Sequence, residues 1–138
     1  MIVTNLERPV ADWSDVEVFT HVVEHLLTMP SRCGVEVHGE FVGRYHRVDD
    51  MGFCHACPVG CLIPRALYAD SCEDGVIRVI AAGEDVWDRR WRVWLFPKDP
   101  QAFDRRLRLL EALQDIHDNT RRDKWKAKLR ELRTQFGL

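Results

Sequence analysis

"CHACPVGCLIP", residues 54–64, is the stretch on which the fold of this chain depends. It places three of the five cysteines within eight residues and then ends in Leu62-Ile63-Pro64. Such a segment can be a metal knuckle, a redox pair or a piece of core that contains sulfur. If it is core, we expect Leu62 and Ile63 to fill the interior, Pro64 to turn the chain and the Tyr68 hydroxyl to find a hydrogen-bond partner.

A structural zinc site is the first interpretation, because zinc prefers four Cys or His ligands in a closed tetrahedron. Cys54-x-x-Cys57 has the spacing of a zinc knuckle. The other spacings argue against it, since Cys57 to Cys61 overlaps the first pair and Cys61 to Cys72 is too long for a second knuckle. The candidate zinc ligands are Cys54, Cys57, Cys61 and Cys72, with His55 or His46 as a substitute.

A redox dithiol and simple packing are the two other interpretations. A reactive Cys54–Cys57 pair normally starts a helix, because the helix N-terminus lowers the thiol pKa. Gly60 and Pro64 would interrupt such a helix soon after it began. Free cysteine is among the most buried residue types, and the apolar neighbours of Cys61 favour a place in the core. We therefore favour packing.

Length and composition indicate one globular domain over residues 1–138, large enough to bury a core. Apolar residues make up 46% and charged residues 30%, which excludes a disordered chain. The formal net charge of −2 provides no overall basic field toward nucleic acid or anionic lipid. Locally, Arg89–Arg92 and Arg105–Arg130 are basic.

The sequence also bears on localisation. No apolar run approaches the roughly 18 residues of a membrane span. The opening residues, MIVTNLERPVADW, lack the basic-then-apolar order of a secretory signal. We therefore expect no membrane partner and a place in the host-cell cytoplasm, where thiols stay reduced.

The N-terminal half predicts a helix and then a small β-hairpin. Ser14-x-x-Glu17 is a capping-box pattern, and apolar residues follow it at helical spacing until Pro30. Between residues 33 and 53, apolar residues alternate and glycines separate them, which indicates one or two short strands. Residues 54–75 carry four cysteines, two prolines and several turn signals, and are predicted to be irregular.

The C-terminal half predicts a pair of helices. Asp99-Pro100 is a start signal with proline at the first helical position, and the helix runs to about His117. Thr120-x-x-Asp123 is predicted to start the last helix. The inner face of that helix is expected to be Trp125, Leu129, Leu132 and Phe136. The expected fold is α+β and helix-dominated, with an N-terminal helix, a small hairpin, an irregular Cys/Pro segment and a C-terminal helical pair.

A histidine pair lies in the first predicted helix. His21-Val22-Val23-Glu24-His25 matches the H-x-x-E-H pattern of inverted zinc peptidases. Histidines at i and i+4 share one helix face, where Glu24 could act as base and Glu111 as a third ligand. The pattern is short and arises easily by chance. We expect His21 and His25 to lie on the polar side of the helix, where they need no function.

Tryptophan and arginine gather between residues 87 and 94. Both residue types are enriched at binding hot spots, so the cluster can be a partner-binding surface. It can equally be core with basic flanks, and residues 75–87 before it fit either a helix or a strand. The candidate partner-binding residues are Trp87, Arg89, Arg90, Trp91, Arg92 and Trp94.

Two separate motifs resemble a known group of proteins. CPVGCLIPRALY, residues 57–68, is similar to the C-A-I-G-x-L-I-P-D-x-x-Y segment of small uncharacterised proteins from phages, prophages and plasmids. SCEDG at 71–75 resembles the acidic-glycine turn that follows that segment in these proteins. LLEALQDIHDN at 109–119 and WKAKLRELRTQFGL at 125–138 resemble their L-x-x-L-Q-x-I-H-D helix and their final helix ending in F-G-L.

The resemblance implies a protein of a mobile element, and it bears on the cysteines. Cys57 is the usual cysteine of the pattern, while the positions of Cys54, Cys61 and Cys72 often hold other residues, which favours packing. The chain departs from the pattern at Arg65, where aspartate is common, and in the longer tryptophan-rich stretch 84–96. The resemblance implies no activity.

These observations favour a protein without catalysis, since the motifs of nucleotide binding and serine hydrolysis are missing. We expect an accessory protein of a phage or other mobile element that binds a host protein, as an anti-defence inhibitor or a regulator. One alternative is a zinc-binding metalloprotein built on the 54–72 cysteine cluster. Another is a nucleic-acid-binding regulator that uses the basic C-terminal helices.

Overall fold

The computed structural model describes residues 8–29, 33–48, 51, 54–74 and 76–138. Its helices are α1 (Asp15–Thr28), α2 (Ile77–Ala82), α3 (Val86–Leu95), α4 (Pro100–Asn119) and α5 (Trp125–Phe136). Its strands are β1 (Gly34–Val37), β2 (Glu40–Gly43), β3 (His46–Val48) and β4 (Cys54–Ala56). The prediction of a helix-dominated α+β fold is confirmed.

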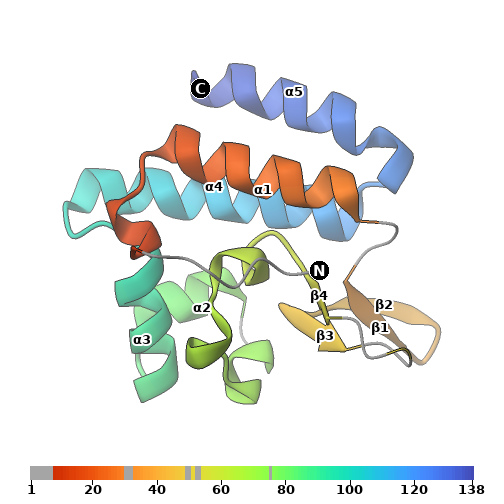
Figure 1. The fold of residues 1–138 in the computed structure, drawn as a ribbon, viewed down its shortest axis with the longest axis horizontal. Helices are drawn as coiled ribbons and strands as arrows, with labels where there is room; N and C mark the ends of the chain where they lie inside the picture. The colour runs from red at the N-terminus through yellow and green to blue at the C-terminus, as the bar shows by residue number, and fades with distance from the viewer. Residues whose placement is uncertain (1–7, 30–32, 49–50, 52–53, 75) are drawn as a thin grey trace.

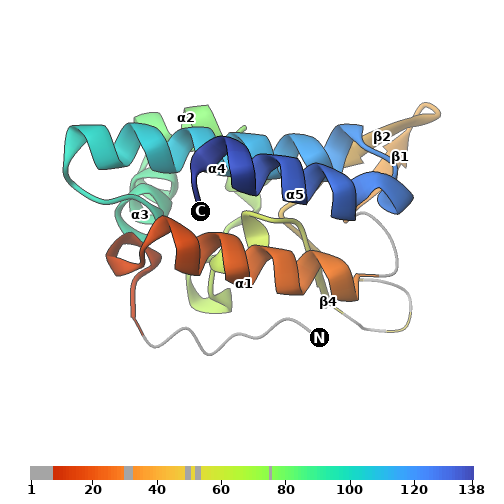
Figure 2. The same cartoon turned by 90° about the horizontal axis from the view of Figure 1, so that it is seen from above.

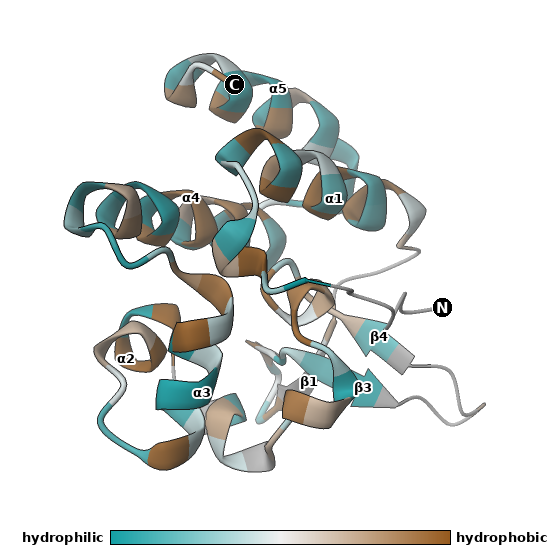
Figure 3. Ribbon diagram, turned by 60° about the vertical axis from the view of Figure 1, so that its left-hand side comes forward, coloured by the Kyte–Doolittle hydropathy of each residue, from teal (hydrophilic) through white to brown (hydrophobic). Residues whose placement is uncertain are grey.

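The three longest helices, α1, α4 and α5, pack together on one side of the molecule, and α5 is stacked on the pair α1 and α4 (Figures 1 and 2). The predicted capping box starts α1: the Ser14 hydroxyl accepts from the Glu17 N–H, and the Glu17 carboxylate accepts from the Ser14 N–H, both at 3.1 Å. The Asp99 carboxylate starts α4 by accepting from the Ala102 N–H at 2.9 Å. Each helix alternates apolar and polar residues along its turns (Figure 3), as amphipathic helices do.

The opposite side of the molecule holds α2 and α3 at one end and two β-hairpins at the other (Figure 1). β1 pairs antiparallel with β2, from Gly34 opposite Gly43 to Val37 opposite Glu40. His38 and Gly39 close this hairpin with φ of 52° and 80°, the left-handed pair that a two-residue hairpin turn requires. The predicted hairpin is therefore confirmed.

The cysteine segment lies between these two sides of the molecule and is tied to three helices. The His25 ring on α1 donates to the Ala56 carbonyl at 2.6 Å. The Gln114 amide oxygen on α4 accepts from the Val59 N–H at 3.2 Å, and the Trp94 indole on α3 donates to the Leu62 carbonyl at 2.8 Å. Leu62 and Ile63 are buried, so the predicted packing role of this segment is confirmed.

The structure differs from the expectations at two places and decides a third that the sequence left open. A second antiparallel pair, β3 with β4, takes up Cys54 to Ala56, which were predicted to be irregular. The ambiguous stretch before the tryptophans forms α2. The last helix starts at Trp125 and not at residue 120, because Thr120 still ends α4, with its N–H bonded to the Ile116 carbonyl at 3.2 Å, and a 3₁₀ turn over Arg122–Lys124 comes before α5. The predicted stop at Pro30 lies outside the described residues.

The inner face of α5 agrees with its prediction. Trp125, Leu129 and Leu132 are buried, and Phe136 is half-buried. The Trp125 indole donates to the Thr120 carbonyl at 2.9 Å, which fixes the turn between α4 and α5. The predicted C-terminal helical pair is therefore confirmed.

Candidate protein-docking surface

The thiols of the cysteine segment are engaged in the core. Cys57 is buried and its sulfur accepts from the Gly60 N–H at 3.3 Å. The Cys61 thiol donates to the Pro58 carbonyl at 3.0 Å. Burial raises the pKa of both thiols, so both stay protonated at neutral pH. A reactive dithiol needs the opposite shift, and Cys57 therefore lacks the environment of a redox cysteine.

The other candidate zinc ligands have separate partners. The buried Cys72 thiol lies 3.6 Å from an Asp88 carboxylate oxygen, and burial, then Asp88, raise its pKa to about 12. The His46 ring donates to the Gly60 carbonyl at 2.7 Å. Within the described residues, no three His, Cys, Asp or Glu side chains are grouped to hold a metal. The side chain of Cys54 lies outside that set, so the zinc alternative stays a prediction, tested by elemental analysis of purified protein.

His21 and His25 hold the core segment, and the prediction that they lie on the polar side of α1 is wrong. Their ring Nε2 atoms donate to the carbonyls of Cys61 at 3.3 Å and Ala56 at 2.6 Å. The end of β4 and the turn that follows it have carbonyls that need donors from elsewhere, and these rings supply them. Glu24 is exposed, and Glu111 pairs with Arg78 at 2.7 Å.

Glu73 is a buried carboxylate that sequence reasoning missed, because it lies in the stretch 54–75 that was predicted to be irregular. Its side chain is 4% exposed. It accepts from the Tyr45 N–H at 2.6 Å, the His46 N–H at 3.1 Å and the Tyr68 hydroxyl, which confirms that Tyr68 places its hydroxyl on a partner. These bonds join the 3₁₀ turn after Tyr68 to the start of β3.

The tryptophan-rich stretch becomes α3, whose inner face belongs to the core. Trp91 is 0% exposed and donates its indole N–H to the Leu67 carbonyl at 2.6 Å. The prediction that Trp91 contacts a partner is therefore wrong, because its ring fills the interior. Trp87 and Trp94 are half-buried at the border of the helix, and the Arg90 guanidinium lies 4.6 Å from the centre of the Trp87 ring.

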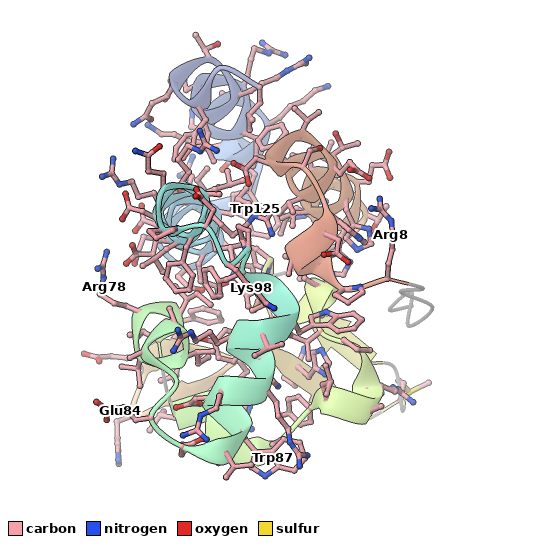
Figure 4. The ribbon with its side chains drawn as sticks, turned by 90° about the vertical axis from the view of Figure 1, so that its left-hand side faces the viewer. Arg8, Arg78, Glu84, Trp87, Lys98 and Trp125 are labelled. Atoms are coloured by element: carbon pink, nitrogen blue, oxygen red, sulfur yellow. The ribbon has the colours of Figure 1, made fainter. Side chains whose placement is uncertain are left out.

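The outer face of α3 combines valines and arginines. Val86 and Val93 are 58% and 67% exposed, and Arg89 and Arg90 are exposed between them. These four positions follow the i, i+3, i+4, i+7 spacing of one helix face. Figure 4 looks onto this helix, with Trp87 at its end far from the long helices and Lys98 just beyond its other end.

Two adjoining hollows flank this face, and we refer to them together as the α3 groove. The first, of about 440 Å³, is lined by Leu67, Trp94 and the four residues of the outer face, with Pro9. The second, of about 850 Å³, has Arg92, Phe96, Lys98 and Phe103 among its lining residues. Pro9, Arg89 and Val93 line both hollows, which makes the groove continuous.

Positively charged side chains outnumber negatively charged ones in the α3 groove. Arg89, Arg90, Arg92 and Lys98 line it, against a single carboxylate, Asp12. Across the residues that the structure describes, none of these four cations forms an ion pair. The groove therefore carries a local positive charge on a chain whose net charge is −2.

Arg106, another residue that sequence reasoning missed, holds the groove wall in place. Its buried guanidinium pairs with Asp15 at 2.8 Å and donates to the Val10 carbonyl at 2.9 Å and the Leu95 carbonyl at 2.7 Å. One side chain of α4 thus fixes the segment that contains Pro9 against the end of α3. A signal existed, because Arg106 stands on the apolar face of α4 beside Leu107 and Leu110.

A further hollow of about 440 Å³ lies beside β2 and α4 and is lined by four acidic residues. All four carboxylates have partners. Glu111 pairs with Arg78 and Asp118 with the His117 ring, both at 2.7 Å. Asp115 accepts from the Asn119 amide at 2.7 Å, and Glu73 accepts from the backbone. This hollow is a solvated acidic surface and not a candidate site.

Comparisons of this chain with protein-family models, curated proteins and solved structures gave no match. In the described part of the chain, none of the helices has the length and apolar character needed to span a bilayer. The resemblance of its two motifs to mobile-element proteins stays an expectation. The α3 groove is thus the feature on which an assignment of function rests.

Proposed function

We propose that this protein is a non-catalytic accessory protein of a phage or other mobile element that binds a host protein through its α3 groove. It would act as an anti-defence inhibitor or a regulator by covering a surface of that host protein. The single observation that carries the proposal is the exposed Val/Arg face of α3 between two hollows.

The physical basis is uncovered apolar surface beside arginine. Covering Val86 and Val93 contributes about 1 kcal/mol each, since full burial of a valine is worth roughly 1.5–3 kcal/mol and both are already partly covered. Arginine and tryptophan are enriched among residues that dominate binding energy. Arg90 already lies over the Trp87 ring, so this pair is oriented before a partner arrives.

The buried titratable groups support a role without catalysis. The sulfurs of Cys57 and Cys61 and the Glu73 carboxylate hydrogen-bond to backbone groups inside the fold. The rings of His25 and His46, whose pKa is lowered by burial, do the same. Such contacts hold the segment between β4 and α2. The α3 groove itself is lined by cations and apolar side chains, a composition suited to recognition.

A charge placed in the groove tests the proposal. Val93→Asp keeps the fold, because Val93 is 67% exposed. It introduces a carboxylate at a position where a bound partner would bury an apolar side chain. The matched control is Val79→Asp on α2, where the valine is 51% exposed and lies outside the groove lining.

The measurement is quantitative affinity purification from host lysate, followed by calorimetry with the purified captured protein. We expect Val93→Asp to weaken binding at least about tenfold, which is roughly 1.4 kcal/mol. Val79→Asp should bind as wild type does. Equal binding by all three proteins would contradict the proposal.

A second candidate function is nucleic-acid binding by the outer face of α5. Residues 121–133 carry seven basic and two acidic residues, and the buried apolar face of α5 turns the basic residues outward. Among the described residues, Lys124, Lys126 and Arg130 are exposed and form no ion pair. Lys126→Ala with Arg130→Ala should then weaken oligonucleotide binding and reduce its dependence on salt. Binding unchanged by this pair, or insensitive to salt, would exclude the candidate.

A further inference from the structure

The exposed face of α3 has a residue pattern that indicates the chemistry of the partner that would bind it. Val86 and Val93 stand seven residues apart, about 10 Å along the helix at 1.5 Å per residue. Arg89 and Arg90 occupy the positions between them. The pattern runs apolar, basic, basic, apolar along a single helix face.

The Trp87 ring holds Arg90 near its place, and neither Arg89 nor Arg90 is neutralised by a described carboxylate. The Arg90 guanidinium lies 4.6 Å from the centre of the Trp87 ring, which leaves its N–H groups toward solvent and partners. Throughout the described ranges, neither Arg89 nor Arg90 pairs with a carboxylate. A partner that brings carboxylates relieves the mutual repulsion of these cations and can bond each guanidinium in a bidentate way.

We infer that the occupant of the α3 groove is an acidic amphipathic helix of the host protein. Two of its apolar side chains would cover Val86 and Val93, and Asp or Glu residues between them would pair with Arg89 and Arg90. The inference rests on the proposed function, because it names the chemistry of the partner at the same site.

The shape of the groove supports a helix as the occupant. A helix that packs against α3 places residues at i, i+3, i+4 and i+7 on the contact, the same spacing that α3 presents. The two hollows on either side of Val93 and Arg89 receive side chains from the flanks of such a helix. Trp94 and Leu67 form an apolar wall on one side, and Lys98 adds a further cation on the other.

A nucleic acid fits this surface less well. Phosphates can pair with arginine, but they leave the exposed valines uncovered. Bases bind proteins mainly by stacking on aromatic faces. Here the Trp87 ring is already covered by Arg90, and the Trp91 ring is buried.

The probe is a synthetic 18-residue helical peptide that carries leucines at i and i+7 and glutamates at i+3 and i+4 on one face. Its control has the same composition, with the leucines and glutamates on different faces. The protein variants are Arg89→Ala with Arg90→Ala in the groove and, as a matched loss of two charges, Lys126→Ala with Arg130→Ala on α5. Binding is measured by fluorescence anisotropy of the labelled peptides at low and high salt.

We expect the patterned peptide to bind at least about tenfold more tightly than its control, roughly 1.4 kcal/mol. The groove variant should lose about tenfold in affinity for it and the α5 variant less than about twofold, because surface charges act within a Debye length of about 10 Å. Higher salt should weaken the binding. Equal affinity for both peptides, or equal losses in both variants, would overturn the inference.

The outcomes separate this inference from the proposed function. If a purified host protein binds less well to Val93→Asp but as before to the groove arginine variant, the acidic helix is excluded and the docking site remains. If both variants bind as wild type does, both fail. Competition by an oligonucleotide, or a dimer of this chain that Val93→Asp abolishes, would overturn the inference in favour of those occupants.

Discussion

Residues 54–64 and residues 86–95 are the two stretches whose composition suggests a site, and the fold treats them in opposite ways. The first is rich in cysteine and lies between α1, α3 and α4, where each described thiol is protonated and packed. The second is rich in tryptophan and arginine and forms a helix with one face in the core and one face in solvent. The comparison teaches that reactive-looking residues indicate a site only where solvent or a partner can reach them.

The largest expected difference is in stability. Leu62→Ala should lower the free energy of unfolding by about 2–5 kcal/mol, because it leaves a cavity where the side chain is 0% exposed. Val93→Ala, on the exposed face of α3, should change it by less than about 0.5 kcal/mol. Urea denaturation of both variants measures the contrast. Similar losses in the two would remove the distinction between core segment and surface helix.

The next difference is in the response to alkali. Burial raises the pKa of Cys57 and Cys61 well above the usual thiol value, and it raises the pKa of Cys33 to about 12. A folded pKa above the unfolded value gives stability that is present below about pH 8.5 and lost as the pH rises, by about 1.4 kcal/mol per pH unit for each thiol. Denaturation curves from pH 7.5 to 10 should show this loss.

Thiol labelling supplies the control for this prediction. The four described cysteines, which are those three and Cys72, should resist labelling in the native protein and react in urea. Fast native labelling of Cys57 or Cys61, or stability that is constant up to pH 10, would contradict their place in the core. Zinc released on labelling would support the metalloprotein alternative.

Within α3 itself, the two faces can be compared through their tryptophans. Trp91→Phe removes the donor to the Leu67 carbonyl and should cost about 1–3 kcal/mol, because a buried acceptor is left without a partner. Trp87→Phe should cost less than about 0.5 kcal/mol in stability, since the ring is half-buried and makes no hydrogen bond that the structure describes. For binding of a partner to the α3 groove, the order should reverse: Trp87→Phe should lower the affinity more than Trp91→Phe does. Equal effects of both changes on stability would mean that α3 lacks an inner and an outer face.

The smallest effect concerns acid. Burial lowers the pKa of His25 and His46, which both bond to carbonyls of the core segment. A folded pKa below the unfolded value gives stability that is present above about pH 6.5 and lost as the pH falls, by at most about 1.4 kcal/mol per pH unit for each ring. The His25→Gln variant should show a shallower loss between pH 6.5 and 5. An unchanged slope would mean that His25 does not titrate with unfolding.

The starts of α1 and α4 could be predicted because they depend on hydrogen bonds between residues that are close in sequence. Ser14 and Glu17 bond to each other across one turn, and Asp99 bonds to Ala102 in the same way. The start of α5 was missed for a related reason. Thr120 is a good cap by type, but it is the residue at which α4 ends, and the chain passes through a 3₁₀ turn before α5 begins.

The candidate site could be predicted only in part. The exposed Arg89, Arg90 and Arg92 were identified by composition, and so were the half-buried Trp87 and Trp94. Trp91 was placed wrongly because a helix turns every third or fourth residue inward, and the stretch was not assigned to a helix. The hollows beside α3 could not be predicted, since Pro9, Leu67 and Phe103 reach them from three other parts of the chain.

The amino-acid sequence by itself determined the helix-dominated α+β class, the capped starts of α1 and α4 and the apolar faces of the long helices, because capping and periodicity act within a few residues. Only the tertiary structure decided the environments of His21, Glu73 and Arg106. Burial and hydrogen bonding there depend on distant residues, such as Val10 and Arg106, which lie 96 positions apart and meet through one hydrogen bond. The same long-range packing decided that the cysteines became core and that the arginines of α3 stayed on the surface.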